Sequence, residues 1–221
     1  MDWSTLPTDG NRFETASCPT HAGPAGEPIR FAVGACWLGT VLAATSDKGI
    51  ASILLGSNAQ SLRRDLRARW PAAVLVDGGA ELGLLLTKVL EFLEAPAGAL
   101  DLPLDARGSE FQQRVWQTLR GIPSGSTASY SEIARRVGAP KEPYAVADAC
   151  AANPIAVAIP CHRVVRKDGT LAGYRWGVKR KRALLEREAG ARMDDAREPA
   201  LPLTSPAAPD SAATGSGAAT R

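Results

Sequence analysis

At 221 residues, the chain has room for one large domain or two small ones. Its hydrophobic fraction of 45% and charged fraction of 22% are those of an ordinary globular protein, which excludes a fibrous or wholly disordered chain. The net charge is only +3, yet residues 105–190 carry 15 Lys and Arg against 8 Asp and Glu. A basic segment of this kind indicates a polyanionic partner, although an arginine-rich solvated surface has the same composition.

Cysteines and histidines are few, and they do not form a C-x-x-C pair: Cys18, Cys36, Cys150, Cys161, His21 and His162. This spacing is not that of a four-ligand zinc site, so we expect neither a metal nor another cofactor. No apolar run approaches the roughly 20 residues that span a bilayer, and the first residues lack the apolar core of a signal peptide. Free thiols without an export signal favour a reducing cytoplasm.

Residues 1–29 are rich in Pro, Thr, Gly and Ala and lack periodicity, which predicts a flexible leader. Cys18 and His21 lie in this leader, where a metal would need two further ligands. Residues 30–56 alternate short apolar runs with the turn sequences WLG and SDKG. They predict a three-stranded antiparallel meander, with Cys36 as a small core residue.

Two helices follow the meander. Residues 58–69 predict a charged helix capped by Asn58, and residues 80–94 predict a helix with a broad apolar stripe. Together, residues 30–100 are expected to form an N-terminal α/β domain with helices on one sheet. Residues 95–108 are expected to link it to the second half.

The second half, residues 105–190, has a helical pattern. The first helix is capped by Ser109, and two shorter helices follow, one capped by Ser129 and one with Pro143 in its first turn. Two short helices joined by a glycine-containing turn are either a helix-turn-helix or a plain structural corner. The whole chain is therefore expected to be α+β.

The last predicted helix is VKRKRALLEREAG, ended by Gly190. Residues 191–221 consist largely of Ala, Pro, Ser, Thr, Gly and Asp. This composition is unable to bury a core, so we expect a disordered tail.

Cys161 stands beside His162 in the stretch IPCHRV. Most lone cysteines are buried and inert, whereas a catalytic thiol needs a base or a positive environment. Charged side chains that could act on the pair lie nearby in sequence or on the final helix: Arg163, Arg166, Glu186 and Glu188. Because neighbouring side chains on an extended chain point apart, a water molecule would have to relay the proton.

The segment IPCHRVVRKDGTLAGYRWGVKRKRALLEREAG resembles the active-site segment of the O6-alkylguanine-DNA alkyltransferases. The resemblance extends through GSEFQQRVWQTLRGIP, ASYSEIARRVG and AANP, covers about residues 31–189, and is closest to the C-terminal domain of the bacterial Ada proteins. It implies a ribonuclease H-like N-terminal domain and a helix-turn-helix in the second domain. It also implies a single-use repair protein that flips an alkylated guanine out of duplex DNA and takes the alkyl group on its cysteine.

The resemblance implies a role for each matching residue. Cys161 would accept the alkyl group. His162 would be the general base, acting through a water molecule, and Glu188 would orient His162. Asn153, before a proline, would hold the turn that leads to the cysteine. Tyr130 would help to rotate the 3′ phosphate and would donate a proton to the departing guanine.

Further residues would bind the substrate and the DNA. Tyr174, Pro160 and the backbone around Val164 would line the guanine pocket. The second helix of the helix-turn-helix would enter the minor groove, where small side chains permit close approach: Ala145, Ala149 and Ala152. The partner would be double-stranded DNA carrying alkylated guanine, with alkylated thymine as a further substrate, and the protein would act as a monomer without membrane contact.

Tyr144 departs from the pattern of the family. The family places an arginine there that fills the space of the flipped base, nine residues before the hinge asparagine. A tyrosine stacks between bases but offers no cationic donor, and Glu142 adds a negative charge close to the phosphates. We therefore expect weaker duplex binding. A methylation-switched transcription activator is not expected, because only a short leader precedes the resemblance.

Three functions remain open on these residues. The first is a stoichiometric DNA repair alkyltransferase. Cys161, His162 and Glu188 together favour this first function. The second is a damaged-base-binding protein with weak or no repair, which Tyr144 keeps open. The third is a Cys–His–Glu hydrolase, which lacks a recognisable oxyanion arrangement.

Overall fold

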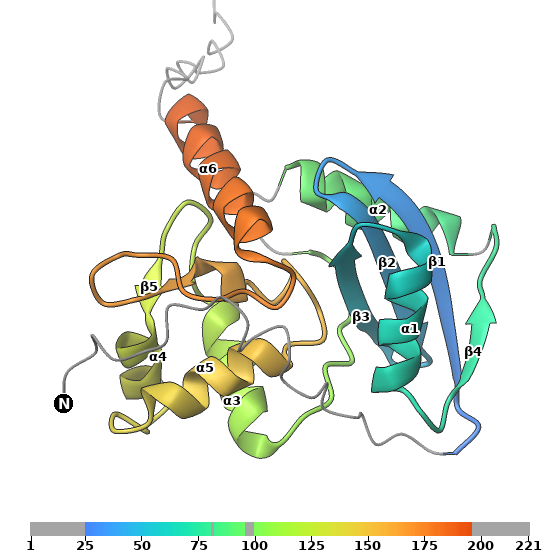
Figure 1. The fold of residues 1–221 in the computed structure, drawn as a ribbon, viewed down its shortest axis with the longest axis horizontal. Coiled ribbons are helices and arrows are strands. Elements are labelled where there is room, and N and C mark those ends of the chain that lie inside the picture. Colours follow the sequence, from blue (N-terminus) through green and yellow to red (C-terminus); the bar gives the residue numbers. More distant parts are fainter. Residues whose placement is uncertain (1–24, 81, 96–99, 196–221) are drawn as a thin grey trace, which may run out of the picture.

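The computed structural model describes residues 25–80, 82–95 and 100–195, with side chains as far as Ala191. An α+β architecture is confirmed. In Figure 1, a sheet with two helices forms one half, and the remaining helices form the other. Most of the expected leader and the tail from residue 196 onward lie outside the described residues.

The sheet of the first half has four strands within the described residues, in the order β3-β2-β1-β4. Their bounds are β1 Pro28–Cys36, β2 Gly39–Ser46, β3 Gly49–Gly56 and β4 Val74–Asp77. The first three strands form the expected antiparallel meander, and β4 pairs with β1 in parallel. The prediction of three strands was therefore wrong. The four residues of β4 are half-buried or exposed at a sheet edge, so they carry no periodic apolar signal.

Two helices pack on this sheet, as expected. Helix α1 spans Ala59–Arg69 and packs on β2 and β3, while α2 spans Gly83–Glu94 and packs mainly on β1. The Asn58 side chain accepts a hydrogen bond from the Ser61 backbone N–H at 2.8 Å, which confirms the predicted cap of α1.

The second half contains four helices and a short two-stranded sheet within the described residues. They are α3 Glu110–Arg120, α4 Tyr130–Arg136, α5 Pro143–Ala152 and α6 Val178–Asp195, with β5 Ala128–Ser129 parallel to β6 Val164–Val165. Ser109 and Ser129 each cap a helix in a reciprocal capping box, as predicted.

Two predicted boundaries were wrong. Strand β1 begins at Pro28, so the last two residues of the expected leader belong to the sheet. Helix α6 continues through Gly190 to Asp195. A glycine inside a helix costs only about 1 kcal/mol relative to alanine, which continued backbone hydrogen bonding offsets.

The two halves meet where β3 runs beside the segment that follows α5. The Ile53 N–H donates to the Pro154 carbonyl at 3.1 Å, and the Ala156 N–H donates to the Ile53 carbonyl at 2.9 Å. Buried Arg69, at the end of α1, also donates from Nη2 to the Asn153 carbonyl at 3.3 Å. The first half therefore holds the backbone that leads to Cys161.

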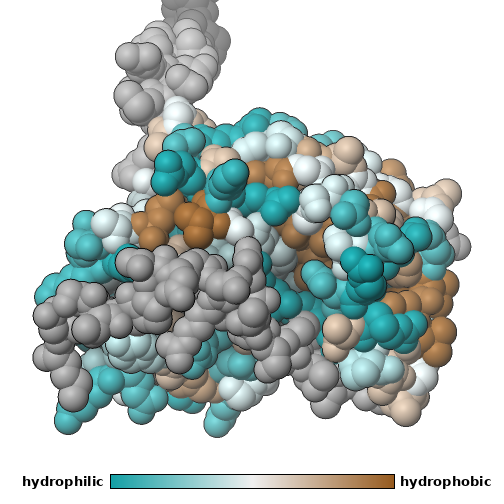
Figure 2. All heavy atoms as spheres, viewed as in Figure 1, coloured by the Kyte–Doolittle hydropathy of each residue, from teal (hydrophilic) through white to brown (hydrophobic). Residues whose placement is uncertain are grey.

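The surface in Figure 2 alternates hydrophilic areas with separate apolar patches. One patch, at the right-hand edge, lies over β4, where Val74 is 52% and Val76 is 38% exposed. Among the described helices, none is long and apolar enough to cross a membrane.

Candidate active site

Cys161 begins a single turn of 3-10 helix, Cys161–Arg163, placed between the carboxyl end of α5 and strand β6. The turn follows Pro160, and Cys161 is only 3% exposed. The next residue, His162, is fully buried, so its imidazole lies inside the protein.

Asn153 holds both ends of the turn that leads to the cysteine. Its Nδ2 donates to the Ile159 carbonyl at 2.8 Å and to the Cys161 sulfur at 3.1 Å, while its Oδ1 accepts from the Ile155 N–H at 2.9 Å. The side chain is fully buried. An amide donor at this distance stabilises a thiolate more than a neutral thiol, so the Asn153 hydrogen bond orients the sulfur and lowers the pKa of the thiol against the effect of burial.

Glu188 of α6 binds His162. The Glu188 Oε1 atom lies 2.8 Å from His162 Nε2. Arg163 donates to the same carboxylate from Nε at 3.0 Å and from Nη2 at 2.8 Å, and the Gly125 N–H donates to Oε2 at 3.3 Å. The carboxylate is therefore fixed from three sides, and it fixes the imidazole in turn.

Burial and hydrogen bonding set the protonation of this pair. Burial alone would raise the pKa of Glu188, but the hydrogen bonds from His162 and Arg163 outweigh it and lower the pKa to about 2. Burial lowers the pKa of His162, against the opposing effect of Glu188. At neutral pH, His162 is neutral and Glu188 is ionised.

This protonation determines the histidine tautomer. An ionised carboxylate only accepts hydrogen bonds, so the proton of a neutral His162 lies on Nε2 and Nδ1 carries the lone pair. Among the described residues, Nδ1 is buried without a hydrogen-bond partner. The geometry thus leaves one basic nitrogen available for a proton.

Cys161 is protonated at rest, because burial raises the pKa of its thiol. The Asn153 hydrogen bond and the charges of Lys181 and Arg175 act against burial and favour the thiolate. Lys181 is fully buried on α6, donates to the Val164 carbonyl at 2.6 Å, and has a pKa that burial lowers to about 8. The thiol is therefore protonated in the resting structure, and the cations near it favour its anion.

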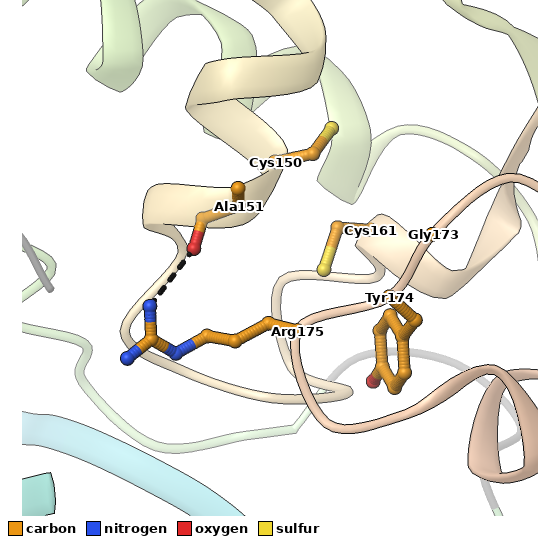
Figure 3. Close-up of a pocket in the computed structure, with 6 residues that line it drawn as sticks. All are labelled: Cys150, Ala151, Cys161, Gly173, Tyr174 and Arg175. Carbon is orange, nitrogen blue, oxygen red and sulfur yellow. Dashed lines mark hydrogen bonds between the residues drawn. The ribbon is translucent and has the colours of Figure 1, made fainter. Parts of the chain in front are cut away.

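A small cavity opens beside the sulfur (Figure 3), lined by Cys150, Ala151, Cys161, Gly173, Tyr174 and Arg175. It encloses about 10 Å³, which is about the room of one water molecule. Tyr174, predicted to line a substrate pocket, lines this cavity. Val164 and Pro160 are buried nearby, but the Val164 carbonyl is occupied by Lys181.

Tyr130 is 6% exposed at the start of α4. Burial, together with the nearby thiols Cys150 and Cys161, raises its pKa well above the ordinary range. Its hydroxyl therefore stays protonated at neutral pH.

The four residues predicted to face DNA do not share one exposed surface. Tyr144 is 56% exposed, and Ala145 is half-buried. Ala149 is 1% and Ala152 is 6% exposed, and the Ala149 carbonyl accepts from Trp116 Nε1 at 2.8 Å. Both alanines belong to the core-facing side of α5, where their small size permits close packing against neighbouring helices. Their contact with DNA stays a prediction.

Sequence reasoning missed where three cations lie: two are buried and the third lines the cavity. Arg163 and Lys181 are nearly or fully buried, and Arg175 lines the cavity. One signal was available for Lys181: it lies seven residues before Glu188, with buried Leu184 between them, so all three share one face of α6. The position of Arg175 depends on the path of a loop, which residue spacing does not define.

Comparison with known proteins identifies relatives of this site. The family model for the DNA-binding domain of 6-O-methylguanine DNA methyltransferase matches residues 110–190. The bifunctional transcriptional activator and DNA repair enzyme Ada of Escherichia coli is 50% identical over 161 residues, which are 73% of this chain and 46% of that protein. The inducible methylated-DNA–protein-cysteine methyltransferase of Bacillus subtilis is 38% identical over 130 residues, which are 58% of this chain and 73% of that protein.

A solved structure agrees with these relatives. The Mycobacterium tuberculosis OGT in complex with DNA matches with a TM-score of 0.59 and 32% identity, covering 74% of this chain and 94% of that chain. The chain spans about half the length of the first curated relatives that it matches. The extent of the Bacillus subtilis match and the shared fold show that this chain belongs to the methylated-DNA–protein-cysteine methyltransferase family.

Proposed function

We propose that this protein repairs DNA by transferring an alkyl group from the O6 atom of guanine irreversibly to the Cys161 sulfur. The observation that carries the proposal is the arrangement around the thiol. Asn153 donates to the sulfur, while neighbouring His162 presents an unprotonated Nδ1 and is bound through Nε2 to an ionised Glu188. This arrangement suits a thiol that is protonated at rest and loses its proton when it reacts.

The reaction needs no second substrate. The thiol proton passes through a water to His162 Nδ1, and the thiolate attacks the alkyl carbon. A carbon–sulfur bond forms as the bond from carbon to guanine O6 breaks. The departing guanine takes a proton from the Tyr130 hydroxyl, which regains one from the solvent, while His162 returns the thiol proton to the solvent. The product is a thioether, which water does not hydrolyse, so each molecule reacts once. Alkylated thymine, with a comparable exocyclic oxygen, is a second proposed substrate.

Duplex DNA is the proposed partner, and α4 with α5 is the proposed helix-turn-helix. The two helices pack against each other, and the first turn of α5 presents Tyr144 to the solvent. We infer that this helix enters the minor groove and that the target base leaves the stack for the Cys161 cavity. The sheet half is inferred to be ribonuclease H-like, with the domain boundary between residues 100 and 105.

The exposure of Tyr144 supports a second candidate function. A tyrosine at the position of the family's arginine leaves the orphaned partner base without a cationic donor. In this alternative, the protein binds damaged bases but repairs them slowly or not at all.

Incubation with a methylated-guanine duplex, followed by digestion and peptide mass analysis, separates the two candidates. Repair predicts one added methyl group on the peptide that carries Cys161, and none in Cys161→Ala. Binding to the methylated duplex with an unmodified Cys161 peptide in the wild-type protein would instead establish the alternative.

A further inference from the structure

Arg175 crosses the cavity that contains the Cys161 sulfur. Figure 3 shows its side chain extending from its loop to the carboxyl end of α5, where Nη1 donates to the Ala151 carbonyl at 3.2 Å. Both residues line the cavity, together with the thiol. Arg175 is half-buried, so this lining residue is also partly exposed to the solvent.

The loop that carries Arg175 is held by its own turns at both ends. Near its start, the Arg166 N–H donates to the Thr170 carbonyl at 3.0 Å, and at its end the Gly177 N–H donates to the Tyr174 carbonyl at 2.8 Å. Gly177 has a φ of +94°, in the left-handed region that glycine enters without strain. The bond from Arg175 therefore adds a tether from this loop to a separate element, helix α5.

The cavity is too small for its proposed substrate. It has room for about one water molecule, whereas an O6-alkylated guanine has more than ten heavy atoms. The base must therefore displace part of the wall. The Cys150 and Tyr174 side chains are buried, which leaves Arg175 as the half-exposed, long and flexible side chain of the lining.

We propose that Arg175 is a latch on the Cys161 cavity, and that its guanidinium must leave the Ala151 carbonyl before a nucleobase or another bulky electrophile reaches the sulfur. The identity of the incoming base rests on the proposed function, whereas the position of Arg175 in the cavity does not. Because the thiol reacts only once, any stray electrophile that reaches it would inactivate the protein, so a narrow resting cavity preserves the thiol.

A DNA phosphate is an alternative hydrogen-bond acceptor for the Arg175 guanidinium. A phosphate oxygen carries a full negative charge and accepts the planar fork of arginine better than a peptide carbonyl does. Duplex DNA therefore compensates for the bond lost at Ala151, whereas a free nucleobase does not. The latch accordingly favours alkylated bases within DNA over the same bases in solution.

The first test measures access to the thiol without DNA. The rate of Cys161 modification is followed by peptide mass analysis with a small reagent, methyl methanethiosulfonate, and a bulkier one, N-ethylmaleimide. The ratio of the two rates removes the effect of Arg175 on thiol ionisation. In Arg175→Ala, the bulky-to-small ratio should rise about tenfold, the worth of one charged hydrogen bond. An unchanged ratio overturns the latch.

Three variants sharpen this test. Lys167→Ala removes an exposed positive charge from the same loop and should leave the ratio unchanged. Arg175→Met keeps the stem but removes the donors, so it should raise the ratio even if the alanine variant folds poorly. Arg175→Lys keeps a donor and should restore most of the wild-type ratio. A ratio that rises equally in Lys167→Ala would show that loop charge, rather than a latch, controls access.

The second test compares two substrates. Arg175→Ala should increase the rate with free O6-methylguanine relative to the rate with a methylated duplex. If neither substrate methylates the wild-type protein, the proposed repair function fails while the thiol test still decides on the latch. Equal changes for the free base and the duplex would contradict the role of DNA in release.

Discussion

Replacement of Glu188 by glutamine tests the buried group that orients His162. The amide removes the charge that three donors share, and it leaves the Arg163 guanidinium, 3% exposed, without an ionised partner. The amide also presents an N–H toward His162 Nε2, which favours the opposite histidine tautomer and protonates Nδ1. We expect both stability and the rate of alkyl transfer to fall.

The magnitude follows from the pKa of Glu188. A folded-state pKa of about 2, against an ordinary value of 4.5, corresponds to about 3 kcal/mol of stability at neutral pH. Loss of one partner from a buried ion pair costs a similar amount, about 3–5 kcal/mol. Because the folded pKa is depressed, this stability is present above pH 4.5 and is lost as the pH falls towards 2. The midpoint of thermal unfolding should fall by roughly 6–12 °C.

Thermal unfolding and the rate of methyl transfer are the two assays. Loss of the correct general base should slow the reaction by about 100-fold or more. Glu186→Gln is the matched control, because Glu186 lies two residues earlier on the same helix and is exposed. The reasoning is refuted if Glu188→Gln unfolds within 1 °C of the control, or if it reacts at the wild-type rate.

Three further predictions concern the proposed general base His162, the buried contact of Arg69 with Asn153, and the exposed Tyr144. Because burial lowers the pKa of His162, the transfer rate should persist below pH 6.5, and a loss of rate above pH 7 on acidification would contradict a neutral histidine. Arg69→Met removes the hydrogen bond to the Asn153 carbonyl and should slow alkyl transfer more than it slows modification of the thiol by a small reagent. Arg69→Lys should restore part of the transfer rate. Equal losses of the transfer rate and the modification rate would indicate general destabilisation instead. Tyr144→Arg should raise the transfer rate on duplex DNA while the reactivity of the thiol stays constant. An unchanged transfer rate would show that Tyr144 does not weaken the action on duplex DNA.

Local signals predicted the framework well. The caps at Asn58, Ser109 and Ser129 were recognised because capping depends on residues three positions apart. Strand β4 was missed because an exposed edge strand of four residues has no local pattern. It is defined by pairing with β1, more than forty residues earlier in the chain.

The candidate site shows the same limit. The motif around Cys161 indicated which residues to examine, but their partners come from distant elements. Glu188 was singled out by resemblance, whereas its clamp by Arg163 and the burial of Lys181 depend on how α6 packs against the 3-10 turn. The burial of Ala149 was not foreseen, because a small residue suits both a groove-facing surface and a tight core, and sequence alone does not distinguish the two.

The most direct test of the central claim is the stoichiometry of transfer. A limiting amount of protein is incubated with an excess of duplex that carries radiolabelled O6-methylguanine, and the label on protein is counted until it reaches a plateau. A single-use acceptor predicts a plateau of one methyl group per molecule, located at Cys161, with no further demethylation of DNA. Continued loss of methyl groups from the DNA beyond one equivalent would contradict it.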